Sequence, residues 1–538
     1  MEKHKVFYPI IIGLAVAVGI FLGSTYTRHA AESHTGSSSS SSNAGNKFDD
    51  IMYYLNNNYV DTIDKNALVE EFIPQILKSL DPHSAYLTPE EVAESAADLQ
   101  GSFSGIGVQF NISNDTVVIV SVISGGPSDK LGILPGDRIV AVDDSLFVGS
   151  EISNSKVLKT LRGEKGSVVQ VTMKRKGSSN PISFDIVRGD IPVNSVDVVY
   201  KIADNTGYIK VSSFGATTHR EFVDAMVELR KQECNNVIID LRNNAGGYLT
   251  TVIQMANEFL RRDQLIVYTE GVNQTREDAI ADGRGNFRYE NVCVLINEWS
   301  ASASEIFAGA IQDHDRGWIV GRRSFGKGLV QQQFPLSDGS ELRLTVSRYH
   351  TPSGRSIQKA YKKGETDDYD VEIENRMLHG EMFQKDSIVL PDSVKYSTAK
   401  GRIVYAQGGI MPDVFVPHDT TLYTAYYTEV LNQGVLYDFA FQYTDKYRSK
   451  LLKYDNWEEL VIYLTKRTNY FTDFVRYAAQ KKIMPNQSEI AKSRPYLENA
   501  LQAYISRNML GDKGFYPILH QQDNAVQKAL ELVGKPIQ

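Results

Sequence analysis

The sequence predicts an α/β protein with an inserted strand-rich domain and a helical domain at its C-terminus. Three observations predict this class. In the middle of the chain, strand-like runs such as Thr206–Ser212 and Val237–Leu241 alternate with helix-like stretches such as His219–Lys231. Strands that alternate with helices are typical of an α/β core. Residues 98–190 are rich in short strand-like runs, and residues 418–538 carry amphipathic helical patterns.

Length and composition are those of a globular protein with several domains. The chain has 538 residues, of which 42% are hydrophobic and 23% are charged. This length predicts about three or four domains. The formal net charge is −8, and Lys and Arg are interspersed with acidic residues. The charge pattern therefore argues against nucleic acid as a main partner.

The N-terminus predicts export. Lys3 and Lys5 precede about 17 largely apolar residues, 6–22, near the lower limit for a helix that spans a bilayer. A cationic start before an apolar run also describes a secretory signal peptide. No Ala-x-Ala cleavage site is well placed after this run, so residues 1–24 are predicted to be an uncleaved signal anchor, with a cleaved signal as the alternative. Positive charge before the segment favours export of the remainder.

The rest of the chain divides into five predicted regions. Residues 25–46 contain a polyserine run and predict a flexible linker. Residues 47–97 predict a helical segment, and residues 98–190 predict the strand-rich domain. The core spans residues 191–417, with a charged, tyrosine-rich inserted loop or hairpin at about 360–400. The C-terminal helices are predicted to cap the core or to form a homo-oligomer interface, with an adaptor surface as the alternative.

The pairing of Ser302 with Lys327 points to nucleophilic chemistry. A serine hydroxyl is a poor nucleophile until a base removes its proton, and a lysine can be that base only when neutral. Lys327 is flanked by glycines and apolar residues, which predicts a buried amine with a lowered pKa. The structural alternative is a capping box, which Ser302 and Glu305 would form at the start of a helix. Both can hold, because helix N-termini also favour negative charge.

Five motifs, in order along the chain, resemble those of one enzyme family. They are Leu80–Glu91, Ile239–Gly247, Ser300–Ile306, Ser324–Gln331 and Tyr349–Gln358. Together they resemble the C-terminal processing peptidases, the tail-specific serine peptidases of S41 type. The resemblance spans about residues 80–415 and implies a crotonase-like peptidase core. It also implies Ser302 as the nucleophile, Lys327 as the general base and Gln331 as the residue that orients the lysine.

An oxyanion hole is expected beside the nucleophile. Acyl transfer needs two donors aimed at the oxyanion of the tetrahedral intermediate. The amide of Ala303, next to Ser302, is one natural donor. The other is expected from the turn at Ala245–Gly247, where missing side chains let the backbone approach a ligand. The resemblance favours Gly246 or Gly247 without choosing between them.

The strand-rich region resembles a PDZ domain, on the segments Ser104–Val108, Thr116–Val122, Gly132–Val142 and Val168–Lys174. Such a domain adds a peptide to a sheet edge and captures its terminal carboxylate on backbone amides. Gly105, Ile106 and Gly107 fit the carboxylate loop. Arg162 resembles a position that couples peptide binding to the active site in relatives.

No cofactor or metal is predicted. The two cysteines, Cys234 and Cys293, lie beside apolar strand-like runs and are predicted to be buried thiols, with a disulfide as the alternative. No Cys/His cluster has the spacing of metal ligands.

Taken together, the sequence predicts an exported serine endopeptidase with a Ser-Lys dyad. It would hold exposed, apolar protein C-termini on its PDZ domain and cleave upstream of them. The expected partners are protein or peptide substrates with free C-termini and, through the anchor, an inner membrane. We expect the body on the periplasmic side of a bacterial inner membrane, or secreted if the signal is cleaved. The alternatives are an inactive PDZ-containing scaffold of the same fold and a crotonase-type acyl-CoA enzyme, which export disfavours.

Overall fold

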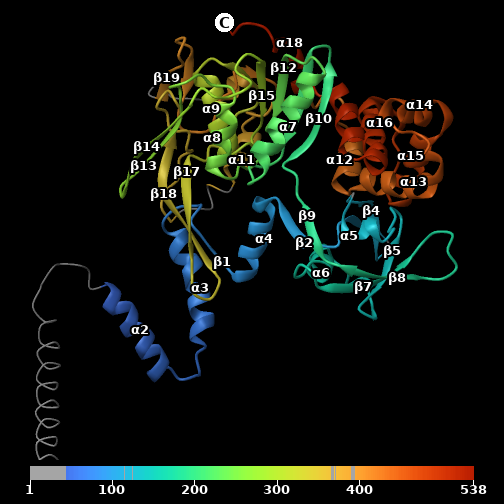
Figure 1. The fold of residues 1–538 in the computed structure, drawn as a ribbon, viewed down its shortest axis with the longest axis horizontal. Helices are drawn as coiled ribbons and strands as arrows, with labels where there is room; N and C mark the ends of the chain where they lie inside the picture. Colours follow the sequence, from blue (N-terminus) through green and yellow to red (C-terminus); the bar gives the residue numbers. More distant parts are fainter. Residues whose placement is uncertain are drawn as a thin grey trace, which may run out of the picture. The chain divides into compact units, whose positions relative to one another are not determined.

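Figure 1 shows the computed structural model, which describes residues 44–113, 115–123, 125–364, 369, 371–388 and 394–537. The chain divides into two compact units, Met1–Ile73 and Pro74–Gln538. The predicted signal anchor lies outside the described residues, as does most of the predicted linker. None of the helices in the described part of the chain is long and apolar enough to cross a bilayer.

The region predicted as a helical segment is helical at both ends but not throughout. Helix α2 (Ala44–Asn58) begins within the last residues of the predicted linker, and α3 (Lys65–Lys78) crosses the boundary of the two units. Strand β1 (Ala85–Leu87) follows, and α4 (Pro89–Gln100) begins at a capping box formed by Thr88 and Glu91. The sequence prediction missed β1, because an alternation of three residues is too short to indicate a strand.

The core is built on a six-stranded sheet of order β10-β11-β12-β15-β16-β21. Its strands are β10 (Val196–Ala203), β11 (Thr206–Val211), β12 (Asn236–Asp240), β15 (Asn291–Ile296), β16 (Gly317–Gly321) and β21 (Val414–Phe415). Strand β10 is antiparallel to β11, and the other neighbours are parallel. Parallel neighbours need crossover connections, which here contain α7 (Thr218–Lys231), α8 (Leu249–Asn257) and α9 (Ala303–Asp313).

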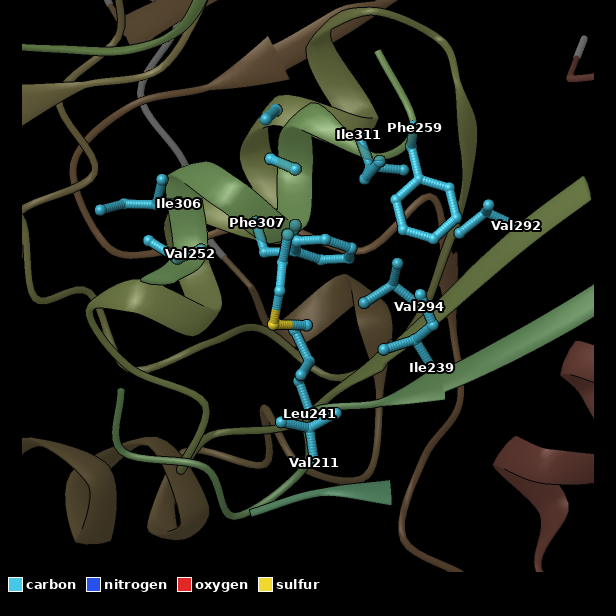
Figure 2. Close-up of a cluster of buried hydrophobic side chains, with 14 of the residues drawn as sticks. Val211, Ile239, Leu241, Val252, Phe259, Val292, Val294, Ile306, Phe307 and Ile311 are labelled. Carbon is cyan, nitrogen blue, oxygen red and sulfur yellow. The ribbon is translucent and has the colours of Figure 1, made fainter. Parts of the chain in front are cut away.

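Both faces of this sheet are buried. Side chains alternate across each strand, so Ile239 and Val294 face one hydrophobic cluster, whereas Ile238 and Cys293 face another. Figure 2 shows the first cluster, in which Phe307 of α9 packs near strand residues such as Ile239 and Val294. The second cluster includes Val526 of α18 (Asn524–Leu532). The C-terminal helix is therefore an integral layer of the core.

A second sheet carries the segments that approach the candidate site. Its strands are β1, β13 (Leu265–Gly271), β14 (Gln274–Ile280), β17 (Leu329–Pro335) and β18 (Glu341–His350). Both β1 and β17 pair with β18. The described parts of the predicted insertion contain α11 (Glu372–Leu378), the 3₁₀ turn η1 (Lys385–Ser387) and β19 (Lys395–Ser397). Strand β19 pairs with β20 (Ile403–Tyr405), just after the predicted insertion.

The strand-rich domain has a sheet of order β3-β4-β5-β7-β8, with β6 paired to β5. Its elements are β3 (Val108–Ser113), β4 (Thr116–Val122), α5 (Pro127–Lys130), β5 (Arg138–Val142), β6 (Ser145–Leu146), α6 (Asn154–Leu161), β7 (Val168–Lys174) and β8 (Ile182–Val187). A ribbon of β2 (Ser102–Gly105) and β9 (Gly189–Pro192) lies where the chain enters and leaves it.

The C-terminal region is helical, as predicted. It comprises α12 (Ala425–Asn432), α13 (Val435–Leu451), α14 (Trp457–Arg467), α15 (Tyr470–Gln480), α16 (Gln487–Leu510), α17 (Asp512–Leu519), the 3₁₀ turn η3 (His520–Gln522) and α18. An aromatic-rich cluster of buried residues from α12 to α16 forms its own core.

Phe307 offers a test of the packing in Figure 2. Its side chain is fully buried, so Phe307→Ala should lower the free energy of unfolding by about 3–5 kcal/mol through lost burial and the remaining cavity. Chemical denaturation measures this, with Tyr289→Ala, at a side chain that is 90% exposed, as the control. A loss below about 1 kcal/mol for Phe307→Ala would contradict the packing.

Candidate active site

Ser302 lies at a sharp turn between β15 and α9. Its φ of 55° and ψ of −115° form a conformation that residues other than glycine rarely adopt. Such strain persists only where the surrounding structure holds it. Ser302 is half-buried, whereas its neighbours at 300, 301 and 303–305 are all buried. The turn therefore leaves Ser302 as the accessible residue of this segment, at a helix N-terminus that favours negative charge.

A buried carboxylate joins Ser302 to the loop that carries Lys327. Glu305 Oε2 accepts the N–H of Ser302 at 2.9 Å and the N–H of Lys327 at 2.8 Å. Its Oε1 accepts the hydroxyl of Ser324 at 2.5 Å and the N–H of Gly326 at 2.7 Å. Burial raises the pKa of Glu305 to about 7, although these four donors act in the opposite direction. The capping role of Glu305 and the nucleophile role of Ser302 are thus compatible.

Tyr349 makes a second connection between the same two residues. Its hydroxyl lies 3.1 Å from the carbonyl oxygen of Ser302 and also hydrogen-bonds to the carbonyl oxygen of Lys327. The ring is fully buried, and it comes from β18 in the second sheet. Sequence reasoning recognised the motif that begins at Tyr349 but not this contact.

Lys327 has the environment that a neutral amine requires. Burial lowers the pKa of Lys327 from its usual value of 10.5, and the charge of Arg343 lowers it further. Its Nζ donates to Oε1 of Gln331, a residue of β17, at 2.9 Å. The lysine that the sequence singled out is therefore both desolvated and fixed in direction.

Gln331 is itself held by a residue of the Leu80–Glu91 motif. Its Nε2 donates to the carbonyl oxygen of His83. The His83 ring lies 2.6 Å from the Tyr369 hydroxyl, and burial followed by the charge of Lys327 lowers the pKa of His83 to about 3. His83 is therefore neutral near pH 7. Asp81 fixes the turn by accepting the N–H groups of His83 and Ser84, both at 2.8 Å.

Two of the backbone amides expected to form the oxyanion hole have no hydrogen-bond partner in the described part of the chain. Neither Ala303 nor Gly247 donates its N–H to a partner among the described residues, whereas the N–H of Gly246 donates to Asn244 Oδ1 at 2.8 Å. The lack of a side chain at Gly246 instead allows Ser302 to approach closely, since a Cβ there would lie 2.8 Å from Ser302 Cβ. The geometry thus separates the two glycines, with Gly247 as the available donor and Gly246 as the close neighbour.

The C-terminal region reaches the strand that leads into this glycine turn. Arg242 donates to Asp240 Oδ2 through Nη2 at 2.6 Å, and its Nη1 lies 2.8 Å from Asp523 Oδ2, just before α18. Burial opposes ionisation of Asp240, but the charge of Arg242 still holds the pKa of this carboxyl below its usual range. The carbonyl oxygen of Arg242 accepts Lys210 Nζ. Asp523 therefore braces Arg242, which lies just before the turn at Ala245–Gly247.

The predicted insertion also contacts the lysine loop. Arg376 of α11 is buried, and it donates to the carbonyl oxygens of Ser324 at 2.8 Å and Phe325 at 3.1 Å.

The other serines of the triplet are structural neighbours. Ser300 and Ser304 are fully buried and donate to the carbonyl oxygens of Leu241 and Asn244, both at 2.8 Å.

In the strand-rich domain, the predicted carboxylate loop precedes an edge strand. Strand β3 pairs with β4 alone among the described strands. The N–H groups of Ile106 and Gly107 have no partner in the described part of the chain, and Gly107 has a φ of 77°. Gly105 pairs with Gly189 at the entry ribbon. Arg162 lies over the ring of Phe103 at 4.3 Å, and its Nε is buried with no hydrogen-bond partner among the described residues.

Neither a metal site nor a disulfide is found in the described residues. No group of three or more His, Cys, Asp or Glu side chains in these ranges could hold a metal ion. Cys234 and Cys293 are both buried and free.

Reaction of Ser302 with a fluorophosphonate probe tests the role of Lys327. Labelling should rise with pH through the lowered pKa of Lys327, because only the neutral amine accepts the serine proton. Gln331→Glu should raise that pKa, since it places a carboxylate beside Nζ, and shift the labelling midpoint to higher pH. Gln332→Glu, at an exposed position of the same strand opposite Leu344, is the control. Equal midpoints for all three proteins would exclude Lys327 as the base.

Glu305→Gln tests the link between the two residues. The amide can keep only one acceptor oxygen for four donors, so Ser302 and Lys327 should lose their alignment, with labelling about 100-fold slower. Labelling rate and melting temperature are measured together, with the exposed Glu277→Gln as the control. A folded Glu305→Gln protein that labels at the original rate would refute the positioning role.

Models of known protein families match three parts of this chain. A model for peptidase family S41 matches residues 205–371, a PDZ domain model matches residues 104–186, and a family of unknown function matches residues 426–511. The carboxy-terminal-processing protease of Bartonella bacilliformis is 34% identical over 345 residues, which are 63% of this chain and 78% of that protein.

Two further comparisons cover similar regions. The carboxy-terminal processing protease CtpB of Bacillus subtilis is 34% identical over 319 residues, 59% of this chain. The match spans 66% of the Bacillus protein, just under two thirds. A solved structure titled photosystem II D1 C-terminal processing protease is 30% identical and covers 60% of this chain and 89% of its own, with a TM-score of 0.35. The predicted family and the α/β class with a PDZ domain are confirmed, and the chain belongs to the carboxy-terminal processing proteases, a family of S41 serine peptidases.

Proposed function

We propose that this protein is an exported serine endopeptidase that hydrolyses peptide bonds with Ser302 and Lys327. The observation that carries the proposal is the position of Glu305. One of its carboxylate oxygens accepts the backbone N–H groups of both the accessible Ser302 and the desolvated Lys327. A lysine with a lowered pKa can accept the serine proton near neutral pH.

The mechanism proceeds by acyl transfer. Lys327 Nζ accepts the proton as Ser302 Oγ attacks the carbonyl carbon of the substrate. The amides of Ala303 and Gly247 stabilise the oxyanion. The protonated lysine then donates to the leaving amine as the peptide bond breaks. Water, deprotonated by the same lysine, attacks the acyl carbon, and the lysine returns that proton to Ser302 Oγ as the ester bond breaks. Gln331 keeps Nζ directed throughout.

The PDZ domain selects the substrate by its C-terminus. The free edge of β3 suits an added peptide strand, and the unpaired amides of Ile106 and Gly107 suit its terminal carboxylate. The cluster beneath the loop includes Ile106, Val157 and Leu161, with Val108 and Phe110 packed against it. These apolar side chains support a preference for an apolar C-terminal residue.

Export completes the proposal. The cationic, apolar segment at residues 1–24 supports a signal anchor that holds the body on the periplasmic side of a bacterial inner membrane. A cleaved signal would instead release the body. The intact mass of the protein purified from membranes distinguishes these two outcomes.

Cleavage by the full-length protein tests the proposed activity. Unfolded reporters should be cut when they end in a free apolar residue and cut poorly when that terminus is an amide. Ser302→Ala should abolish cleavage, whereas Ser178→Ala, at an exposed serine, should not. Equal cutting by Ser302→Ala would show that another residue is the nucleophile. Normal binding of free C-termini with no cleavage by any variant would instead favour the inactive scaffold.

A further inference from the structure

The direction of a bound peptide follows from the carboxylate loop. Residues 105–107 precede β3, so a peptide whose terminal carboxylate binds there has its C-terminus at the start of that strand. The peptide must then run opposite to β3, and its upstream residues approach the end of the strand at Ser113. A strand advances about 3.4 Å per residue in both chains, so the six residues of β3 match about six peptide residues.

A cavity of about 490 Å³ lies at that end of β3. The PDZ domain contributes Ser113 and Arg138, and helices α13 and α15 of the C-terminal region contribute the remaining lining, including Tyr447 and Tyr477. Arg138 Nη2 forms an ion pair with Asp445 of α13 at 2.7 Å, which fixes the PDZ strands beside the cavity. The cavity therefore shares Ser113 with the end of the strand along which the proposed peptide runs.

The lining suits an extended peptide. Tyr447 lies 4.7 Å from Tyr443 between ring centroids, and a side chain of the peptide can pack on such aromatic surfaces. Gln442 and Tyr477 place an amide and a hydroxyl group in the lining, and Gln442 donates to the Tyr477 hydroxyl at 2.9 Å. The charges of Arg138 and Asp445 compensate each other, as do those of Arg476 and Asp473 at 3.0 Å. Lys446 adds a positive charge to the lining.

We propose that this cavity is a second subsite for the substrate. It binds the segment that begins about seven residues before the C-terminus, in extended form and with an aromatic or long aliphatic side chain against Tyr447. The protease would then read a longer tail than a PDZ domain alone, using a surface from the C-terminal helical region. This subsite rests on the proposed function, because it requires a C-terminus bound at residues 105–107.

Peptide length separates the two sites in a binding experiment. Two fluorescent peptides share one apolar C-terminus, one six residues long and one extended upstream to fourteen residues with a phenylalanine eight residues from its end. Anisotropy is measured with the full-length chain carrying Ser302→Ala, so that neither peptide is cut. We expect the longer peptide to bind about threefold to tenfold more tightly.

Tyr447→Ala should remove that advantage and leave the affinity for the short peptide unchanged. Tyr437→Ala is the matched control, because this tyrosine lies on the same helix, is 37% exposed and does not line the cavity. Equal affinities of the two peptides for the parent protein, or an advantage that survives Tyr447→Ala, would overturn the subsite. Equal weakening of both peptides would do so too, because it would mean a disturbed PDZ domain. If neither peptide binds the parent protein, the proposed tail recognition itself fails.

Discussion

The buried carboxylate of Glu305 is the interaction on which the active site depends. Ser302 ends a segment that comes from the central sheet, whereas Lys327 lies in the loop just before β17 of the second sheet. One oxygen of Glu305 accepts an N–H from each. Charge-assisted hydrogen bonds to a buried carboxylate are strong and directional, so a single group sets the serine and the lysine in one frame. The Tyr349 hydroxyl also connects the two residues, because it hydrogen-bonds to both of their carbonyl oxygens.

Around this frame, each remaining part of the chain restrains one side of the site. The first motif holds Gln331 through the carbonyl oxygen of His83, and the insertion holds the lysine loop through Arg376. The C-terminal region holds the approach to the glycine turn through Asp523, and α18 covers one face of the central sheet. The C-terminal region therefore contributes to the packing of the peptidase core.

Much of this arrangement could be predicted from the sequence because the signals are local. Ser302, Lys327 and Gln331 lie within short motifs, and the alternation of strands and helices indicated the α/β class. The partners of these residues could not be predicted, since they are distant in the chain. His83 and Gln331 are separated by 248 positions, and nothing near Asp523 indicates an arginine partner. The choice between the two glycines also needed geometry, because only the structure shows which amide is already occupied.

Trapping the acyl-enzyme tests the central claim most directly. A slowly hydrolysed peptide ester is mixed with the full-length protein, the reaction is quenched in acid, and the modified residue is found by peptide mapping. The account predicts an acyl group on Ser302 that does not accumulate in Lys327→Met. An acyl group on another residue, or equal acylation of Ser302 in Lys327→Met, would contradict it.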